Sequence, residues 1–151
     1  MKIFKIFSIL IVLLIFLTAC NTETIVKPED IEQIKIELIS KSNLPNGIAY
    51  TLKLKNHSKF TIAQNNVFIS YPIKTSNGSR GNEFKIVAKN NKLKIESGEE
   101  VVLSSFAPVE EYENNKNLDI DNLDIEIIGY VDEVKEARRF QRYGGIDAFS
   151  E

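Results

Sequence analysis

Few residues of this chain belong to the types that do chemistry. Among 151 residues there are one Cys, one His and no Trp. One Cys and one His cannot supply the ligands of a thiolate–imidazole zinc site, and a single Cys cannot close an internal disulfide. The sequence also contains no G-x-S-x-G, H-E-x-x-H or C-x-x-C motif and no glycine-rich phosphate loop. The common motifs of serine hydrolases, zinc proteases, thiol redox proteins and nucleotide-binding proteins are therefore excluded.

The single histidine, His57, stands next to Ser58. A nucleophilic hydrolase could use such a pair as general base and nucleophile. The pair falls in a polar turn after an alternating apolar run, however, and no carboxylate is placed to orient the imidazole. We interpret His57 as a solvated turn residue and predict no catalytic residues. A His57→Ala variant that lost function while staying folded would contradict this interpretation.

Acidic residues gather in the last third of the chain, and they are the best candidates for a metal site. These are Asp119, Asp121, Asp124 and Glu126. Calcium binds six to eight oxygens, which such a cluster could partly supply, but the EF-hand loop pattern and its Gly are missing. Asp124 and Glu126 also alternate with apolar residues, as on the solvated face of a strand. We therefore expect no metal and no cofactor.

Basic and aromatic residues interleave near the C-terminus. They are Lys135, Arg138, Arg139, Phe140, Arg142 and Tyr143. Such interleaving occurs in grooves for single-stranded nucleic acid, and it would also suit an anionic wall polymer. The chain has 19 Lys and Arg against 21 Asp and Glu, a net charge of −2, so no basic field attracts nucleic acid. We favour a charged surface anchored by two aromatic rings, with wall-polymer binding as the alternative, and we expect no nucleic-acid partner.

The first twenty residues have the composition of a targeting segment. Lys2 and Lys5 lead into an almost unbroken apolar run over residues 6–17. A run of this length suits the apolar region of a signal peptide better than a membrane-spanning helix, which needs about 20 apolar residues. The run ends in the four residues Leu17-Thr18-Ala19-Cys20.

These four residues resemble the lipobox of bacterial lipoproteins: a Leu, two small or compact residues, then Cys. The resemblance implies that residues 1–19 are a lipoprotein signal peptide and that the Cys20 thiol is diacylglyceryl-modified. It also implies a place on the extracytoplasmic face of a bacterial membrane. Removal of residues 1–19 takes away two Lys, which leaves 17 basic and 21 acidic residues, a charge of −4. The two acyl chains, rather than charge, would then hold the protein at the membrane.

The mature chain is expected to divide into a short tether and one domain. Residues 20–30 are polar, include Pro28 and lack a sustained pattern, as is typical of a lipidated N-terminus and tether. Over residues 31–151 the dominant period is two, which predicts antiparallel strands around a single core. About six or seven short strands separated by turns predict an all-β fold, an immunoglobulin-like antiparallel β-sandwich.

A hairpin is predicted around Asn90-Asn91. A two-residue loop at these positions pairs Ala88 with Leu93 and Ile86 with Ile95. Both apolar sets then lie on the same face, as the register of a half-buried hairpin requires.

Two segments leave alternatives open. Pro72 cannot donate to a ladder, so either its run is an edge strand there or pairing ends at Tyr71. Residues 132–143 begin with a capping Asp132 and are followed by two glycines, which favours a short C-terminal helix. A closing strand around residues 140–143 is the alternative that a sandwich would use.

Parts of the domain resemble small sandwich modules of bacterial envelope lipoproteins, of which FxLYD-type domains are the nearest family. The shared features are a strand that ends in Asn56 before a polar turn and a turn from Ile95 to Glu99 that leads into another strand. Ser97 stands where such modules often have Pro, and the aromatic-Leu-Tyr-Asp signature is missing. The resemblance covers roughly half of the mature chain, and it implies an interaction role without catalytic residues.

We therefore expect a lipid-anchored, non-catalytic binding or accessory module of the bacterial cell envelope that contacts an envelope protein through strand edges and loops. The edge near Pro72 and the loop over residues 76–82 are the expected contact elements. One alternative is a calcium- or wall-polymer-binding lipoprotein. Another is an envelope hydrolase that uses carboxylates such as Glu110, Glu111 and Asp119, but these lie in a polar stretch without the signature of a buried acid.

Overall fold

The computed structural model describes residues 25–150. The predicted signal peptide 1–19, the lipobox Cys20 and the first half of the predicted tether therefore lie outside the described residues. Within the described part, none of the helices has the length and apolar character needed to cross a membrane.

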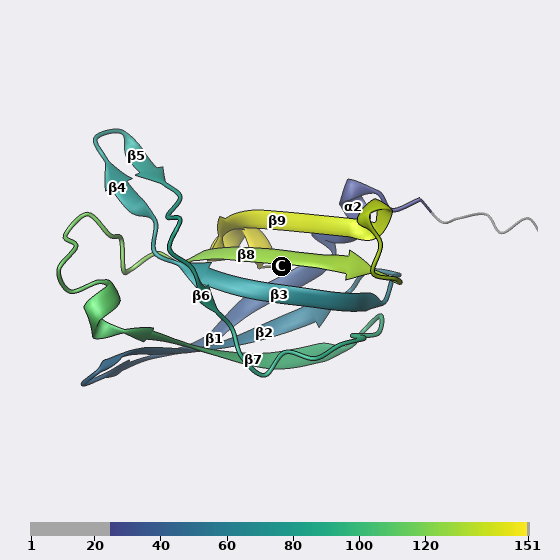
Figure 1. Cartoon of the computed structure of the whole chain (residues 1–151), viewed down its shortest axis with the longest axis horizontal. Coiled ribbons are helices and arrows are strands. Elements are labelled where there is room, and N and C mark those ends of the chain that lie inside the picture. The colour runs from purple at the N-terminus through teal and green to yellow at the C-terminus, as the bar shows by residue number, and fades with distance from the viewer. Residues whose placement is uncertain (1–24, 151) are drawn as a thin grey trace, which may run out of the picture.

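Seven strands form two antiparallel sheets that face each other (Figure 1). The first sheet has the order β1-β2-β7, with bounds Ile34–Leu44, Gly47–Asn56 and Glu100–Pro108. The second has the order β6-β3-β8-β9, with bounds Ile86–Val87, Ile62–Ser70, Asp124–Val131 and Arg139–Gly145. A small hairpin of β4 (Ile73–Thr75) and β5 (Gly78–Arg80) projects from one end of the sandwich.

The order of the strands confirms the predicted fold class. The chain crosses from the first sheet to the second between β2 and β3, and again between β7 and β8. In immunoglobulin nomenclature, β1, β2 and β7 correspond to A, B and E, and β6, β3, β8 and β9 correspond to C′, C, F and G. The protein is an all-β, antiparallel sandwich.

The alternation along β2 shows why this sequence builds a sandwich. Ile48, Tyr50, Leu52 and Leu54 are each at most 3% exposed, while the residues between them face outward. The facing sheet supplies matching apolar side chains, which are Val67, Ile69, Ile125 and Ile127. Each such side chain contributes about 1.5–3 kcal/mol when it leaves water. The period of two in the sequence thus becomes a single core between the sheets.

The hairpin predicted around Asn90-Asn91 is wrong. β6 pairs with β3, Lys89 pairs with Ser104 of β7, and Ile95 pairs with Ile62 of β3. The segment therefore crosses from the edge of one sheet to the edge of the other and returns. A type I′ hairpin needs a positive φ at both loop residues, but of the two only Asn90 has one, at 64°. The open edges of the two sheets offer these residues backbone partners that a sequence pattern does not reveal.

Both open alternatives are resolved. The ladder of β3 with β8 ends at Ser70, and the buried Pro72 lies between β3 and β4, so pairing ends here rather than continuing as an edge strand. The predicted helix over residues 132–143 is wrong. After a 3-10 turn, η2 (Glu136–Arg138), the chain forms the closing strand β9 against β8.

Asp132, the expected cap of that helix, explains this outcome. It has a φ of 61°, and its backbone N–H donates to the carbonyl oxygen of Thr61 at 2.7 Å. The residue therefore turns the chain back toward β8, which has an edge to be paired. A 3-10 turn, η3 (Ile146–Phe149), follows β9 and buries Phe149.

A five-residue helix, α2 (Pro28–Glu32), precedes the first strand. Ile31 is buried in the core, and Lys59 Nζ lies 3.0 Å from a carboxylate oxygen of Asp30. The helix spans the predicted boundary between tether and domain at residues 30 and 31, and that boundary stays a prediction. Another 3-10 turn, η1 (Val109–Glu111), follows β7.

Candidate functional site

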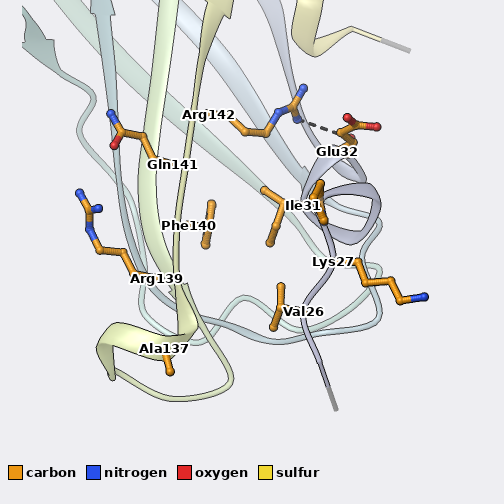
Figure 2. Close-up of a pocket in the computed structure, with 10 residues that line it drawn as sticks. Val26, Lys27, Ile31, Glu32, Ala137, Arg139, Phe140, Gln141 and Arg142 are labelled. Carbon is orange, nitrogen blue, oxygen red and sulfur yellow. Dashed lines mark hydrogen bonds between the residues drawn. The ribbon is translucent and has the colours of Figure 1, made fainter. Parts of the chain in front are cut away.

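A groove lies between α2 and β9, at the end of the sandwich where the described chain begins (Figure 2). Its volume is about 420 Å³. One wall comes from α2 and the residues before it, with Val26 and Ile31. The other wall comes from η2 and β9, with Ala137, Phe140 and Arg142. The apolar side chains of Val26, Ile31 and Phe140 face one another across the groove.

Arg142 holds one end of the groove in place. Its guanidinium donates to the carbonyl oxygens of Ile34 and, at 3.1 Å, Ala148, and it lies 4.3 Å from the centroid of the Phe149 ring. A longer bond of 3.5 Å reaches the carbonyl oxygen of Glu32. Partial burial lowers the pKa of Arg142, and the negative charge of Glu32 opposes this shift. The side chain therefore joins β9 to the start of β1 and to η3.

The basic segment predicted near the C-terminus is not one continuous surface. Phe140 is buried, and Arg142 is bound to carbonyl oxygens. Arg139 and Gln141 point away from the groove on the other side of the strand (Figure 2). Lys135 Nζ forms an ion pair with Glu133 at 2.7 Å. The predicted wall-polymer surface thus has its cations on different sides of β9.

Tyr143 belongs to the outer face of the second sheet. Its hydroxyl donates to Asp124 Oδ2 at 2.5 Å. Partial burial, together with this bond to the carboxylate, raises the pKa of Tyr143 to about 12. The aromatic side chain therefore anchors the edge of the sheet by a hydrogen bond as well as by packing.

The predicted acidic cluster is dispersed. No group of three or more His, Cys, Asp or Glu residues within residues 25–150 could hold a metal ion. Asp119 accepts a hydrogen bond from Asn122 Nδ2 at 2.8 Å, and Asn122 together with the nearby Lys74 lowers the pKa of this carboxyl. Glu110 and Glu111, the other carboxylates considered for a hydrolase, are exposed on η1.

Glu126 is not on a solvated face, and that part of the sequence interpretation is wrong. It lies on the outer side of β8 but is only 5% exposed. Lys85 Nζ donates to Glu126 Oε2 at 2.6 Å, and Gln141 Nε2 donates to Oε1 at 2.7 Å. The segment before β6 lays Lys85 across the outer face of the sheet and so covers this carboxylate. The pair is a structural ion pair between segments 41 residues apart.

His57 and Ser58 do not form a catalytic pair. Ser58 is 1% exposed, and its hydroxyl donates to Asn56 Oδ1 at 2.7 Å. Asn56 Nδ2 in turn donates to the carbonyl oxygens of Phe60 at 2.8 Å and Ile95 at 3.0 Å. Asn56 therefore ties the turn after β2 to the segment before β7. These are the two turns whose resemblance to envelope modules the sequence already singled out.

Three tyrosines form a cluster that the sequence did not reveal. The hydroxyl groups of Tyr50 and Tyr71 are 2.7 Å apart and buried, and the rings of Tyr71 and Tyr112 meet edge to face at 5.8 Å. Burial raises the pKa of Tyr50 and of Tyr71. The cluster belongs to the core near η1, where Tyr112 packs against the buried Tyr50 and Tyr71.

Sequence reasoning found the β9 side of the groove through its basic and aromatic residues but missed the α2 side. A signal was present: Pro28 followed by Glu29 and Asp30 is a typical start of a helix. A comparison with protein-family models found no match, and a comparison with curated proteins found none. The resemblances to the lipobox and to FxLYD-type domains therefore stay predictions.

Proposed function

We propose that the protein is a lipid-anchored, non-catalytic accessory module on the extracytoplasmic face of a bacterial membrane. The observation that carries this proposal is the sequence Leu17-Thr18-Ala19-Cys20 shortly before a folded sandwich. Its partners are the membrane, through the diacylglyceryl group on Cys20, and a second envelope protein.

Chain length supports an orientation of the domain. Ile25 comes five positions after Cys20, and a fully extended chain over five positions reaches at most about 18 Å. The end that carries α2 therefore stays near the lipid, and the end that carries β4 and β5 points away from it (Figure 1). Residues 74–81 are exposed, and the β4–β5 hairpin, which ends at Arg80, includes most of the predicted contact loop over residues 76–82.

The side chains that could take part in catalysis are occupied within the fold, which supports a binding role. Ser58, Glu126 and Arg142 are each engaged by hydrogen bonds inside the fold. What the sandwich presents outward is strand edges and a projecting hairpin, and such elements recognise other proteins.

The anchor is tested by metabolic labelling with an alkyne analogue of palmitate, followed by membrane fractionation. The proposal predicts a labelled, membrane-bound protein and complete loss of both properties in Cys20→Ala. Label or membrane retention in the Cys20→Ala protein would contradict it. The partner is tested by cross-linking the anchored protein in cells and identifying what is attached by mass spectrometry.

A further inference from the structure

Four strands form the edges of the two large sheets, and three of them are closed to further pairing. β1 has a register shift between Leu38 and Ser40, and beyond it the exposed Lys41 donates to the carbonyl oxygen of Ile120. A bulge and a lysine on an edge strand are devices that prevent edge pairing. On β7, the backbone of Ser104 is bonded in both directions to Lys89. β6 has only two residues.

β9 is the exception. It pairs with β8 over all seven of its residues without a register shift, and within residues 25–150 no strand pairs with its other side. The groove touches the consecutive residues 139–142. Because successive side chains of a strand point to opposite faces, contact with four residues in a row means that the groove follows the main-chain edge itself. The N–H of Arg139 donates to the carbonyl oxygen of Glu136, so the part of this edge that is available for pairing begins after it.

The groove also has two features that select a side-chain pattern. Phe140 and Arg142 are two residues apart and so share one face of β9, where Phe140 meets Ile31 across the groove. Arg142 is a partly buried cation that donates to carbonyl oxygens. The carboxylate of Glu32 also lines this groove and acts on Arg142 by its charge, but among the described residues it forms no ion pair with it. Its end of the groove therefore suits an additional negative charge.

We propose that the groove binds an extended peptide segment of a partner protein, which adds as a strand to the edge of β9. The segment places an apolar side chain against Phe140 and Ile31 and, two residues away on the same face, an Asp or Glu toward Arg142. Cross-strand neighbours on one face interact most directly, so the spacing of the two groups on β9 fixes their spacing on the ligand. This inference rests on the proposed function, whose protein partner it describes more closely.

The position of α2 decides between a single extended segment and the edge of a second folded copy. α2 and the residues just before it form the wall opposite β9. A second copy that presented its own β9 would bring its own α2 to the same place. A lone extended strand needs only the space between the two walls, and its backbone can be fully paired on the side of β9.

The test uses the full chain in lipid nanodiscs and short, end-blocked fluorescent peptides. In each peptide, Thr occupies every second position. The positions between them, which would lie on the same face as Phe140 and Arg142, carry Val and Glu in either order. Binding is followed by fluorescence anisotropy. Replacement of Glu by Gln in the peptide is expected to weaken binding at least about tenfold, because it removes the charge opposite Arg142. If neither order saturates below about 1 mM, the proposal is overturned.

Two controls separate strand addition from simple burial of apolar groups. Peptides N-methylated at even or at odd positions should differ at least about tenfold, because only one set of N–H groups faces β9. Equal binding of the two would indicate apolar or lipid-like binding and contradict the proposal. Ala137→Phe fills the groove and should abolish binding, whereas Val134→Phe, at a residue 57% exposed outside the groove, should not. Binding that survives Ala137→Phe also contradicts it.

The same pair of variants separates this inference from the proposed function. A partner cross-linked in cells that is lost in Ala137→Phe but kept in Val134→Phe supports both. A partner kept in both variants contradicts the groove as its docking site and leaves the accessory role standing. The absence of any cross-linked partner in the anchored wild-type protein contradicts the proposed function itself.

Discussion

At the scale of single residues, the polar groups that matter most are the buried ones. Asn56 is fully buried and uses its side-chain amide to join the turn after β2 to the segment before β7. Its own backbone is bonded as well: its N–H donates to Glu99, and its carbonyl oxygen accepts from Gly98. A buried network of this kind fixes one geometry because each unpaired member would be costly.

Asn56→Ala is therefore expected to lower the free energy of unfolding by about 3 kcal/mol, since it removes three buried hydrogen bonds of the Asn56 side chain. Asn114→Ala, at an exposed position, serves as the matched control and should change stability by less than about 0.5 kcal/mol. Urea unfolding followed by circular dichroism measures both. Equal stability of the two variants would contradict the role assigned to Asn56.

The tyrosine pair predicts a dependence on alkaline pH. The pKa values of Tyr50 and Tyr71 are raised above the ordinary value of 10.0 in the folded state. The stability that this shift contributes is fully present below pH 10 and is lost as the pH rises through the folded pKa values. The free energy of unfolding should therefore fall above pH 10.

The double variant Tyr50→Phe/Tyr71→Phe should lose much of this alkaline dependence. Tyr130→Phe, outside the cluster, should keep it. At pH 7, Tyr71→Phe alone should cost about 1–2 kcal/mol because it leaves the Tyr50 hydroxyl unpaired, and the double variant should cost less than the two single changes together. Thermal unfolding from pH 7 to 11 measures these effects. Additive costs would show that the two hydroxyl groups do not act as a pair.

At the scale of elements, the strands with a buried face were predictable because alternation is local. Ile48 to Leu54 shows its period of two without reference to any other segment. The path of residues 86–95 was not predictable in the same way, because their partners are the edges of β3 and β7. Strand β9 was open to two interpretations because it, too, depends on a distant partner. Its local residues favour a helix, but pairing with the edge of β8 makes it a strand.

The path of residues 86–95 is tested with paired cysteines in a chain that carries Cys20→Ser. Lys89→Cys/Ser104→Cys should close a disulfide on mild oxidation, because these residues face each other in an antiparallel bridge. Ala88→Cys/Leu93→Cys, the pair expected from the hairpin, should stay reduced, since Ala88 is 6% exposed and Leu93 is 68% exposed. Mass spectrometry after alkylation distinguishes the two. The opposite pattern would restore the hairpin.

Only the β9 side of the groove was predictable from the sequence. The interleaved basic and aromatic residues pointed to β9, but Glu126 and Arg142 could not be assigned partners because these lie far away in sequence. Only the three-dimensional arrangement shows that Arg142 is held by carbonyl oxygens of β1 and η3. Burial of Glu126 depends likewise on Lys85, whose segment reaches across the sheet.

At the scale of the whole molecule, the sandwich has two functionally different ends. The α2 end carries the groove and lies next to the chain that leads to Cys20, while the β4–β5 hairpin projects from the opposite end (Figure 1). A lipid on Cys20 would therefore bring the groove close to the membrane and leave the hairpin facing outward. A juxtamembrane segment of another envelope protein is the partner best placed to reach β9.

We propose that the lipid anchor brings this module to a protein partner, and cross-linking in living cells can detect that partner. The tagged wild-type protein and Cys20→Ala are treated in parallel, and attached proteins are identified by mass spectrometry. We expect one dominant envelope protein that is cross-linked to the wild type and lost in Cys20→Ala. A wild-type protein that is present, folded and membrane-bound but enriches no partner would contradict it.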